Sequence, residues 1–313
     1  MTKKPVLLFA CAGIDEAAWL SALNASLPDV ELRIWPQIGD PAEIDYALLW
    51  KRPASIAASL PNLRVLFSMG AGVESLLADP ELPANVRLAR MVDPSLGEGM
   101  REYVLHRVLH YHRRMPELEA AQRARTWTPL VCKAARDQRV GLLGLGELGR
   151  SCGAALAALG FDVAGWSRTP RDLPGITTYS GDEGLRQMLG RTDILVCLLP
   201  LTPATENILC KATFDAMPPG GFLINAARGR HLVERDLLDA FDDRQLAHAT
   251  LDVFREEPLP QDHPFWDHPR IDVTPHCSAL TSPTTAARTL AANIARDLAG
   301  EPIPDLVDRS RGY

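Results

Sequence analysis

The sequence lacks an excess of basic side chains, and it lacks any long apolar run. Its 33 lysines and arginines are outnumbered by 39 aspartates and glutamates, which gives a net charge of -6. This sign argues against nucleic acid or an anionic membrane as a partner. No apolar run reaches the roughly 18 residues that a membrane-spanning helix needs. We therefore expect a cytoplasmic protein that binds neither nucleic acid nor a membrane.

Cysteine pairs and clusters of metal ligands are also missing from the sequence. None of the six cysteines stands in a Cys-x-x-Cys spacing, and most have apolar neighbours. This pattern predicts reduced thiols in the interior of an intracellular protein. His106 and His110 lie four residues apart and could share a metal, but no third ligand follows at a suitable spacing. We expect both histidines to be structural and no metal to be bound.

Apolar strand patterns alternate with helical patterns along the whole chain of 313 residues, a length that suits two domains. Apolar strands separated by helices predict parallel sheets that are covered on both faces, so the expected fold class is α/β with two doubly wound domains. A long helical pattern at 283–298 is expected to return to the first domain and make it discontinuous. The strand patterns lie at 6–10, 31–35, 46–50, 65–68, 162–166, 194–199, 222–226, 249–253 and 271–273.

A glycine-rich turn follows the apolar run 140–143. Gly144, Gly146 and Gly149 form the pattern Gly-x-Gly-x-x-Gly and lead directly into the helical pattern 151–159. The first glycine permits the tight turn, the second lets a pyrophosphate approach the backbone, and the third lets the helix press onto the strand. The N–H groups at the start of the helix would hold the phosphates. The sequence therefore predicts a dinucleotide site here, which includes Glu147 and Leu148 between the glycines.

The residues that follow the next strand pattern indicate which dinucleotide binds. An NAD-binding fold usually places Asp or Glu about 20 residues after the glycine turn, to bind the ribose hydroxyls. This chain has Ser167 and Arg168 there, with Arg171 nearby. An acid would repel a 2′-phosphate, whereas these side chains can bind one. We expect NADPH as the preferred cofactor, with NADH possible; a polar turn with exposed arginines is the alternative.

Two loops in the first domain lie where a substrate would bind. One begins at Trp50 and Lys51, and the other runs from Met69 through Gly70, Ala71 and Gly72 to Val73. Both follow strand patterns, and ligands of open α/β sheets bind beyond the carboxyl ends of strands. The glycines would let backbone N–H groups turn toward a carboxylate. A simple glycine turn before a short helix explains the second loop equally well.

Three polar residues near the ends of late strand patterns are the candidates for catalysis. Arg228 follows the pattern 222–226, Glu257 follows 249–253, and His276 follows 271–273. Taken singly, each could be an ordinary loop residue.

Together with the other motifs, they make the chain resemble the D-isomer-specific 2-hydroxyacid dehydrogenases, and most closely their glyoxylate/hydroxypyruvate reductase branch. The resemblance covers nearly the whole chain and is specific because many motifs occur in the same order. Cys277 and Ser278 stand at positions that are often apolar in this family, which could alter the pocket wall. The motifs are Trp50-Lys51, Met69-Gly70-Ala71-Gly72-Val73, the glycine turn, Trp166-Ser167-Arg168, Leu198-Leu199-Pro200-Leu201-Thr202, Asn225-Ala226-Ala227-Arg228-Gly229, Leu251-Asp252-Val253-Phe254 and Pro275-His276.

The resemblance implies a reaction and a role for each candidate residue. NADPH would deliver hydride to the ketone carbon of a small 2-oxoacid, so that glyoxylate gives glycolate and hydroxypyruvate gives glycerate. Arg228 would hold the carboxylate and polarise the carbonyl, His276 would donate the proton, and Glu257 would orient His276 and favour its charged form. Asp252 would bind the nicotinamide carboxamide, and Trp50 would form a wall of the substrate pocket.

The resemblance also implies the domain organisation. A flavodoxin-like substrate domain would comprise residues 1–98 and 282–313, and a Rossmann nucleotide domain residues 99–281, with the active site in the cleft between them. The family usually forms homodimers, and the weakly periodic segment 117–133 is expected to pack on a partner subunit. Further cofactor-binding residues implied are Leu199, Pro200, Thr202, Ala226 and Ala227.

Two alternatives remain open at this stage. Another 2-hydroxyacid dehydrogenase could act on a bulkier or a phosphorylated oxoacid, although Trp50 beside the pocket favours small substrates. The same fold also serves as a nucleotide-sensing binding protein in the C-terminal-binding-protein corepressors, which can retain the catalytic residues.

Overall fold

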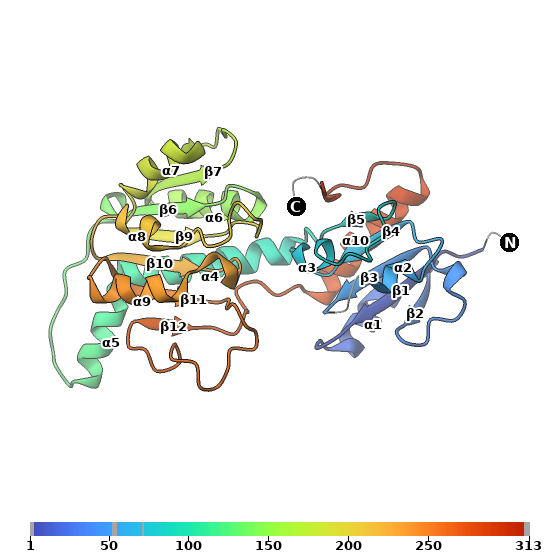
Figure 1. The fold of residues 1–313 in the computed structure, drawn as a ribbon, viewed down its shortest axis with the longest axis horizontal. Helices are drawn as coiled ribbons and strands as arrows, with labels where there is room; N and C mark the ends of the chain where they lie inside the picture. The colour runs from blue at the N-terminus through green and yellow to red at the C-terminus, as the bar shows by residue number, and fades with distance from the viewer. Residues whose placement is uncertain (1–2, 52–54, 71, 310–313) are drawn as a thin grey trace. The chain divides into compact units, whose positions relative to one another are not determined.

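The computed structural model describes residues 3–51, 55–70 and 72–309. The chain forms two compact units, each with its own parallel sheet (Figure 1). Unit 1 comprises Met1–Leu96 and Leu280–Tyr313, and unit 2 comprises Gly97–Ala279. The predicted fold class, with two doubly wound parallel-sheet domains, is confirmed. Among the described residues, no helix is both long and apolar enough to cross a membrane, and none of the six cysteines is in a disulfide.

Unit 1 has a five-stranded sheet in the order β2-β1-β3-β4-β5, the arrangement of flavodoxin-like folds. Every pairing is parallel. Strands β1, β3 and β4 are buried along most of their length, because helices cover both faces. The strands are β1 Val6–Cys11, β2 Glu31–Ile34, β3 Tyr46–Trp50, β4 Val65–Ser68 and β5 Arg87–Ala89, and the helices are α1 Glu16–Ser26, α2 Ser55–Ala58, α3 Glu74–Leu77 and α10 Pro283–Leu298.

Unit 2 has a seven-stranded parallel sheet in the order β12-β11-β10-β9-β6-β7-β8. Figure 1 shows these strands side by side, with β6 between β7 and β9. The chain order reverses at β6, which is the switch point where Rossmann folds bind dinucleotides. The strands are β6 Arg139–Leu143, β7 Asp162–Ser167, β8 Thr177–Ser180, β9 Ile194–Cys197, β10 Gly221–Asn225, β11 Leu246–Leu251 and β12 Ile271–Val273, and the helices are α4 Pro94–His112, α5 Met115–Arg123, α6 Glu147–Ala158, α7 Gly181–Leu189, α8 Lys211–Asp215 and α9 Glu234–Asp242.

Several elements have no counterpart among the patterns in the sequence, the short helix α8 among them. Strand β5 has only three residues, and β8 consists of Thr177, Thr178, Tyr179 and Ser180 at the edge of its sheet, so neither has an apolar run. Helix α5, at the start of the weakly periodic segment after α4, buries no residue.

A buried carboxylate on α10 ties the end of the chain to the sheet of unit 1. Asp297 is 4% exposed, and it accepts hydrogen bonds from the hydroxyl of Tyr46 at 2.7 Å and from Nη2 of Arg87 at 2.5 Å. Nη2 of Arg64 lies 2.8 Å from its Oδ2. Burial by itself would raise the pKa of Asp297, but these hydrogen bonds and the two positive charges outweigh it and hold the pKa below the usual value.

The lowered pKa of Asp297 makes its contribution to stability depend on pH. Because the folded state binds this proton less tightly than the unfolded state, the contribution is full above the unfolded pKa and is lost as pH falls through the folded pKa. We expect Asp297→Asn to lower the free energy of unfolding by about 1–3 kcal/mol at pH 7. Urea denaturation measured from pH 7 down to pH 3 should show a constant deficit that shrinks below about pH 4. Asp29→Asn, at an exposed position, is the control; an equal deficit there would contradict the role of Asp297.

Candidate active site

The glycine turn after β6 has the geometry that the sequence predicts. Gly144 has φ 103°, in the region that favours glycine, and a Cβ there would lie 2.9 Å from the carbonyl oxygen of Leu198. A Cβ on Gly149 would lie 1.9 Å from the carbonyl oxygen of Gly144, so α6 could not approach the strand so closely with any other residue. A Cβ on Gly146 would meet no atom within 4 Å. At Gly144 and Gly149 the turn is therefore packed closely against backbone atoms. At Gly146, where α6 starts, there is free space, and a phosphate would bind there.

The other predicted cofactor residues stand at the same edge of the sheet. Ser167 ends β7, and its hydroxyl donates to the carbonyl of Thr169 at 2.8 Å, while Arg168 is exposed. Thr205 fixes the loop after β9, because its hydroxyl donates to the carbonyl of Pro200 at 2.7 Å and accepts from the N–H of Thr202 at 2.9 Å. These segments all follow the carboxyl ends of parallel strands, as a dinucleotide site requires. Leu199 belongs to the loop after β9, Glu147 and Leu148 begin α6, and Ala226 and Ala227 follow β10.

His276 and Glu257 form a direct pair. Nδ1 of His276 lies 2.7 Å from Oε2 of Glu257, and the side chains are 43% and 34% exposed. Glu257 is itself fixed, because its Oε1 accepts the backbone N–H of Phe254 at 3.0 Å. A carboxylate can only accept, so Nδ1 of His276 carries the hydrogen and Nε2 is the nitrogen left for a substrate.

The carboxyl group of Glu257 stays ionised over a wide pH range. Burial raises its pKa, but the hydrogen bonds from His276 and from the backbone of Phe254 lower it, and so do the charges of His276 and Arg228. The net effect is a pKa below the ordinary value. The charged carboxylate is therefore available to hold the imidazole of His276 through Nδ1.

Arg228 comes close to this pair through the backbone of the loop after β10. A Cβ on Gly229 would lie 1.9 Å from the carbonyl carbon of Phe254, so only glycine lets the loop after β10 cross the loop after β11. Nη1 of Arg228 donates to the carbonyl of Ala227 at 2.6 Å. The amide of Asn225 donates to the carbonyl of Arg228 at 3.1 Å and holds the turn. The sequence motif includes Gly229 beside Arg228, but it does not reveal this close backbone contact.

Asp252 is a fully buried carboxylate that binds the segment around His276. Its Oδ1 accepts the hydroxyl of Thr274 at 2.6 Å and the N–H of Cys277 at 3.0 Å, and its Oδ2 accepts the N–H of Ser278 at 2.9 Å. The carbonyl of Asp252 also accepts the N–H of His276 at 2.8 Å. Asp252 thus fixes the backbone on both sides of the imidazole, a role that the sequence did not reveal.

The predicted substrate loops of unit 1 follow β3 and β4. Trp50 ends β3, and its ring packs on Gly70, where a Cβ would lie 2.6 Å from Cζ3 of the indole. The N–H of Met69 donates to the carbonyl of Leu49 at 3.1 Å, and the side chain of Met69 is buried. The hydroxyl of Ser68 donates to the carbonyl of Gly72 at 3.1 Å and closes the turn. Ala71 lies outside the described residues.

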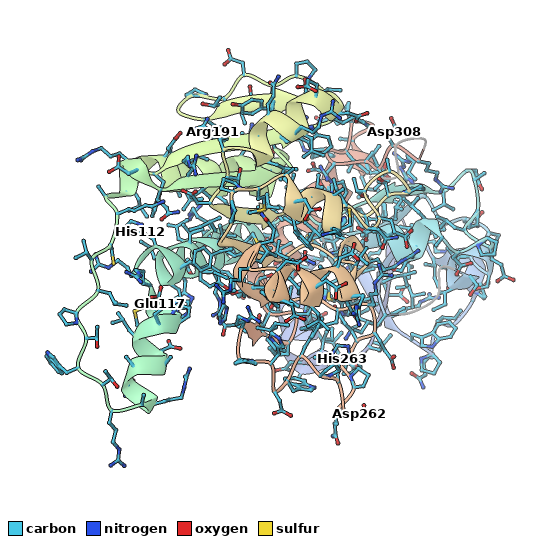
Figure 2. All side chains as sticks on the ribbon, turned by 60° about the vertical axis from the view of Figure 1, so that its left-hand side comes forward. His112, Glu117, Arg191, Asp262, His263 and Asp308 are labelled. Carbon is cyan, nitrogen blue, oxygen red and sulfur yellow. The ribbon has the colours of Figure 1, made fainter. Side chains whose placement is uncertain are left out.

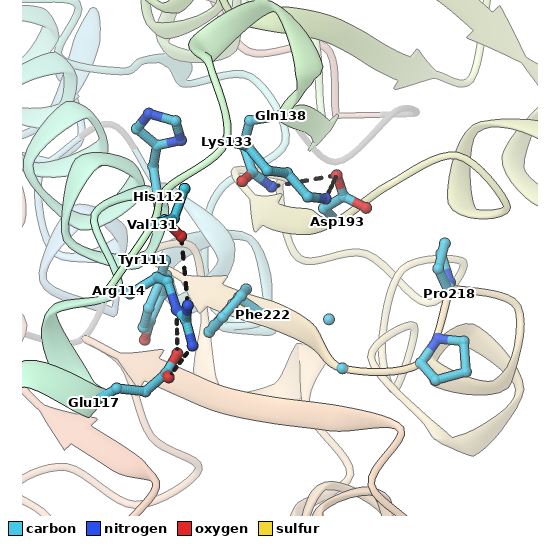
Figure 3. Close-up of a pocket in the computed structure, with 13 residues that line it drawn as sticks. Tyr111, His112, Arg114, Glu117, Val131, Lys133, Gln138, Asp193, Pro218 and Phe222 are labelled. Carbon is cyan, nitrogen blue, oxygen red and sulfur yellow. Dashed lines mark hydrogen bonds and ion pairs between the residues drawn. The ribbon is translucent and has the colours of Figure 1, made fainter. Parts of the chain in front are cut away.

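A cavity of about 300 Å³ in unit 2 lies at the opposite edge of the sheet (Figure 3). Its wall includes Gln138, Asp193 and Phe222, which stand at the amino ends of β6, β9 and β10. Its charged groups are already paired, Arg114 with Glu117 and Lys133 with Asp193 (Figure 3). The carboxyl ends, which bring Arg228, Glu257 and His276 together, are the better candidate for chemistry. Among the described residues, no group of three or more His, Cys, Asp or Glu side chains could hold a metal ion.

Comparison with known proteins gives consistent matches over nearly the whole chain. Residues 105–278 match the family model described as D-isomer specific 2-hydroxyacid dehydrogenase, NAD binding domain. A glyoxylate/hydroxypyruvate reductase A of Yersinia enterocolitica is 44% identical over 312 residues, which cover 98% of this chain and 99% of that protein. The corresponding protein of Serratia proteamaculans is 43% identical over 300 residues, covering 94% and 96%.

Solved structures agree with these matches. A D-isomer specific 2-hydroxyacid dehydrogenase from Xanthobacter autotrophicus, in complex with NADPH and MES, has a TM-score of 0.95 and 40% identity, covering 99% of this chain and 100% of that one. An NADPH-dependent glyoxylate/hydroxypyruvate reductase from Sinorhizobium meliloti, in complex with NADP and sulfate, has a TM-score of 0.94 and 38% identity, with the same coverage.

Proposed function

This chain belongs to the D-isomer specific 2-hydroxyacid dehydrogenase family, and we propose that it reduces small 2-oxoacids with NADPH, glyoxylate to glycolate and hydroxypyruvate to glycerate. The observation that carries the proposal is the 2.7 Å pair of His276 and Glu257 in the unit that holds the glycine turn. The pair supplies a proton donor, and the turn fits a dinucleotide. Relatives named as glyoxylate/hydroxypyruvate reductases support the substrate class.

In the proposed mechanism, the residues of the chain hold the oxoacid and provide the proton. The guanidinium of Arg228 binds the carboxylate and draws electron density toward the ketone oxygen. When bound, the reduced nicotinamide supplies hydride to the ketone carbon. Nε2 of His276 donates its proton to the oxygen, which becomes the hydroxyl group, and the neutral imidazole then regains a proton from solvent. Glu257 holds the ring through Nδ1 throughout.

We assign the remaining site residues by the same proposal. Backbone N–H groups of the loop Met69–Val73 would bind the carboxylate, and Trp50, whose indole packs on Gly70, would restrict the pocket to small substrates. Gly144, Gly146 and Gly149 would receive the pyrophosphate with the start of α6. Residues 1–96 and 280–313 would then serve as the substrate domain, and 97–279 as the nucleotide domain.

We also propose a cytoplasmic homodimer. From Arg113 to Asp137 no residue is buried, and Trp127 and Val131 are 98% and 89% exposed. Figures 1 and 2 show α5, which carries Glu117, and the segment after it projecting from the sheet of unit 2. Exposed apolar side chains on a projecting segment suit a protein interface. Cysteines that form no disulfide within the described residues suit a reducing compartment. Light scattering should give the mass of two chains, and cell fractionation should place the protein in the cytoplasm; a mass of one chain would contradict the dimer.

Replacement of His276 tests the proposed reaction. The oxidation of NADPH with glyoxylate, hydroxypyruvate and the bulkier phenylpyruvate is followed at the nicotinamide absorbance band. We expect the two small oxoacids to give the highest kcat/KM, and His276→Asn to lower kcat by about 100- to 10,000-fold, because it removes the acid.

The matched control is His263→Asn. His263 lies 3.5 Å from Glu234, so it belongs to another pair of His and Glu in the same unit, and it is labelled in Figure 2. We expect this variant to keep wild-type kcat. Faster reduction of phenylpyruvate would instead favour a larger substrate. Binding of NADPH with no turnover of any oxoacid would favour the nucleotide-sensing alternative.

Cofactor preference tests the role of Ser167 and Arg168. A hydrogen bond to a charged group contributes about 1.5–3 kcal/mol, and solvent screening at an exposed arginine keeps the effect near the lower end. We expect a preference for NADPH over NADH in kcat/KM that Arg168→Ala reduces by about 10-fold through weaker NADPH binding. Added salt should reduce the preference in the same direction. Arg235→Ala, which removes an exposed arginine of α9, is the control, and a wild-type protein that prefers NADH would refute the assignment.

A further inference from the structure

A chain of hydroxyl groups connects α4 to the buried carboxylate behind His276. The hydroxyl of Tyr103, on α4, lies 2.7 Å from Oγ1 of Thr274. Thr274 follows β12, and its hydroxyl lies 2.6 Å from Oδ1 of Asp252, which follows β11. Asp252 is 0% exposed. Three segments that are distant in the sequence therefore share one line of hydrogen bonds.

The direction of each hydrogen bond follows from the number of hydrogens available. The hydroxyl of Thr274 donates its single hydrogen to Oδ1 of Asp252. The hydroxyl of Thr274 must then accept from Tyr103, and Tyr103 is the donor. Burial raises the pKa of Tyr103 to about 12, so its hydroxyl keeps the hydrogen at neutral pH. Donors aligned in this way polarise one another and strengthen the bond at the carboxylate.

The carboxylate at the end of this chain fixes the backbone that carries His276. It accepts the N–H groups of Cys277 and Ser278, the two residues after His276. His276 itself has φ 51°, a left-handed conformation that costs a residue with a Cβ about 1–2 kcal/mol. Such a conformation persists only where surrounding bonds impose it. The bonds to Asp252 impose it here, and Thr274 and Tyr103 hold Asp252 in position.

We propose that Tyr103 is a positioning residue for His276, acting through Thr274 and Asp252 on the turn that presents the imidazole. The inference rests on the proposed function, in which His276 is the proton donor. Tyr103 does not need to touch the substrate for this role. Its hydroxyl completes the set of donors that keeps the buried carboxylate, and hence the turn, in a single arrangement.

The same helix offers a matched control. The hydroxyl of Tyr111 lies 2.5 Å from Oγ1 of Thr250 and 3.4 Å from Nδ1 of His248. Tyr111, which is buried, is likewise a tyrosine of α4 whose hydroxyl bonds a threonine, but Thr250 lies within β11 and not in the turn that contains His276. Removing either hydroxyl deletes the same group from the same helix, and Tyr111 is the more deeply buried of the two, so a general loss of stability should appear at least as strongly in Tyr111→Phe.

The first experiment compares Tyr103→Phe with Tyr111→Phe in the full chain. Misplacement of a reacting group by about 1 Å can cost 100-fold, so a loosened turn should cost about 10-fold in kcat for glyoxylate reduction. We expect this loss in Tyr103→Phe, with the Kd of NADPH unchanged, and wild-type kcat in Tyr111→Phe. Equal kcat in the two variants would overturn the proposal.

Substitutions of Thr274 test whether Tyr103 acts through it. Thr274→Val removes the link and should lower kcat at least as much as Tyr103→Phe. Thr274→Ser retains the hydroxyl and should restore most of the activity. The double variant Tyr103→Phe/Thr274→Val should be no slower than Thr274→Val alone, because both changes interrupt the same chain. Additive losses would show that Tyr103 acts by another route.

Hydrogen exchange supplies a measure that does not depend on the reaction. The amides of Cys277 and Ser278 should exchange faster in Tyr103→Phe than in the wild type, and should be unaffected in Tyr111→Phe. If the wild type fails to reduce any oxoacid, the proposed function is wrong, while faster exchange would still establish the link to the turn. An active wild type with unchanged exchange in Tyr103→Phe would refute the positioning role alone.

Discussion

The fully buried carboxylate of Asp252 is the constraint on which the candidate active site depends. A buried charge is costly unless its lone pairs are satisfied, and Asp252 has the hydroxyl of Thr274 and two backbone N–H groups as donors. These donors can reach it only if the segment after β12 adopts the turn that contains His276. The cost of leaving the carboxylate unsatisfied therefore enforces a backbone conformation that His276 would not adopt by itself.

The parallel sheet of unit 2 explains how the remaining groups gather around this turn. Arg228, Glu257 and His276 follow β10, β11 and β12, which are neighbours in the sheet, so loops separated by many residues open at one edge. The glycine turn follows β6 at the same edge. Because Gly229 has no side chain, the loop after β10 can lie in direct contact with the loop after β11. The strand order thus places the loops that carry Arg228, Glu257 and His276 next to one another. The close backbone contact at Gly229 brings two of these loops together.

Unit 1 uses a buried carboxylate in a different way. Asp297 accepts from Tyr46 on β3 and from Arg87 on β5, so it fastens the last helix of the chain to a sheet built from the first residues. Its partners include two cations that are 41% and 42% exposed, whereas the hydrogen-bond donors to Asp252 in the described part of the chain are neutral. Asp297 thus links parts of the chain that are distant in sequence, whereas Asp252 stabilises the turn that contains His276.

The sequence by itself determined the fold class, the cofactor turn and the family, because each depends on local periodicity or on residues at fixed spacing. Gly144, Gly146 and Gly149 lie within six residues, and strand β12 and helix α10 lie where the pattern places them. The polar edge strand β8 carries no such pattern, so it could not be foreseen. Only the tertiary structure decided that Asp252 binds the His276 turn and that Tyr103 reaches Thr274, a residue 171 positions away. Such contacts arise when separate strands and a helix pack together, and no spacing in the sequence records which side chains then meet.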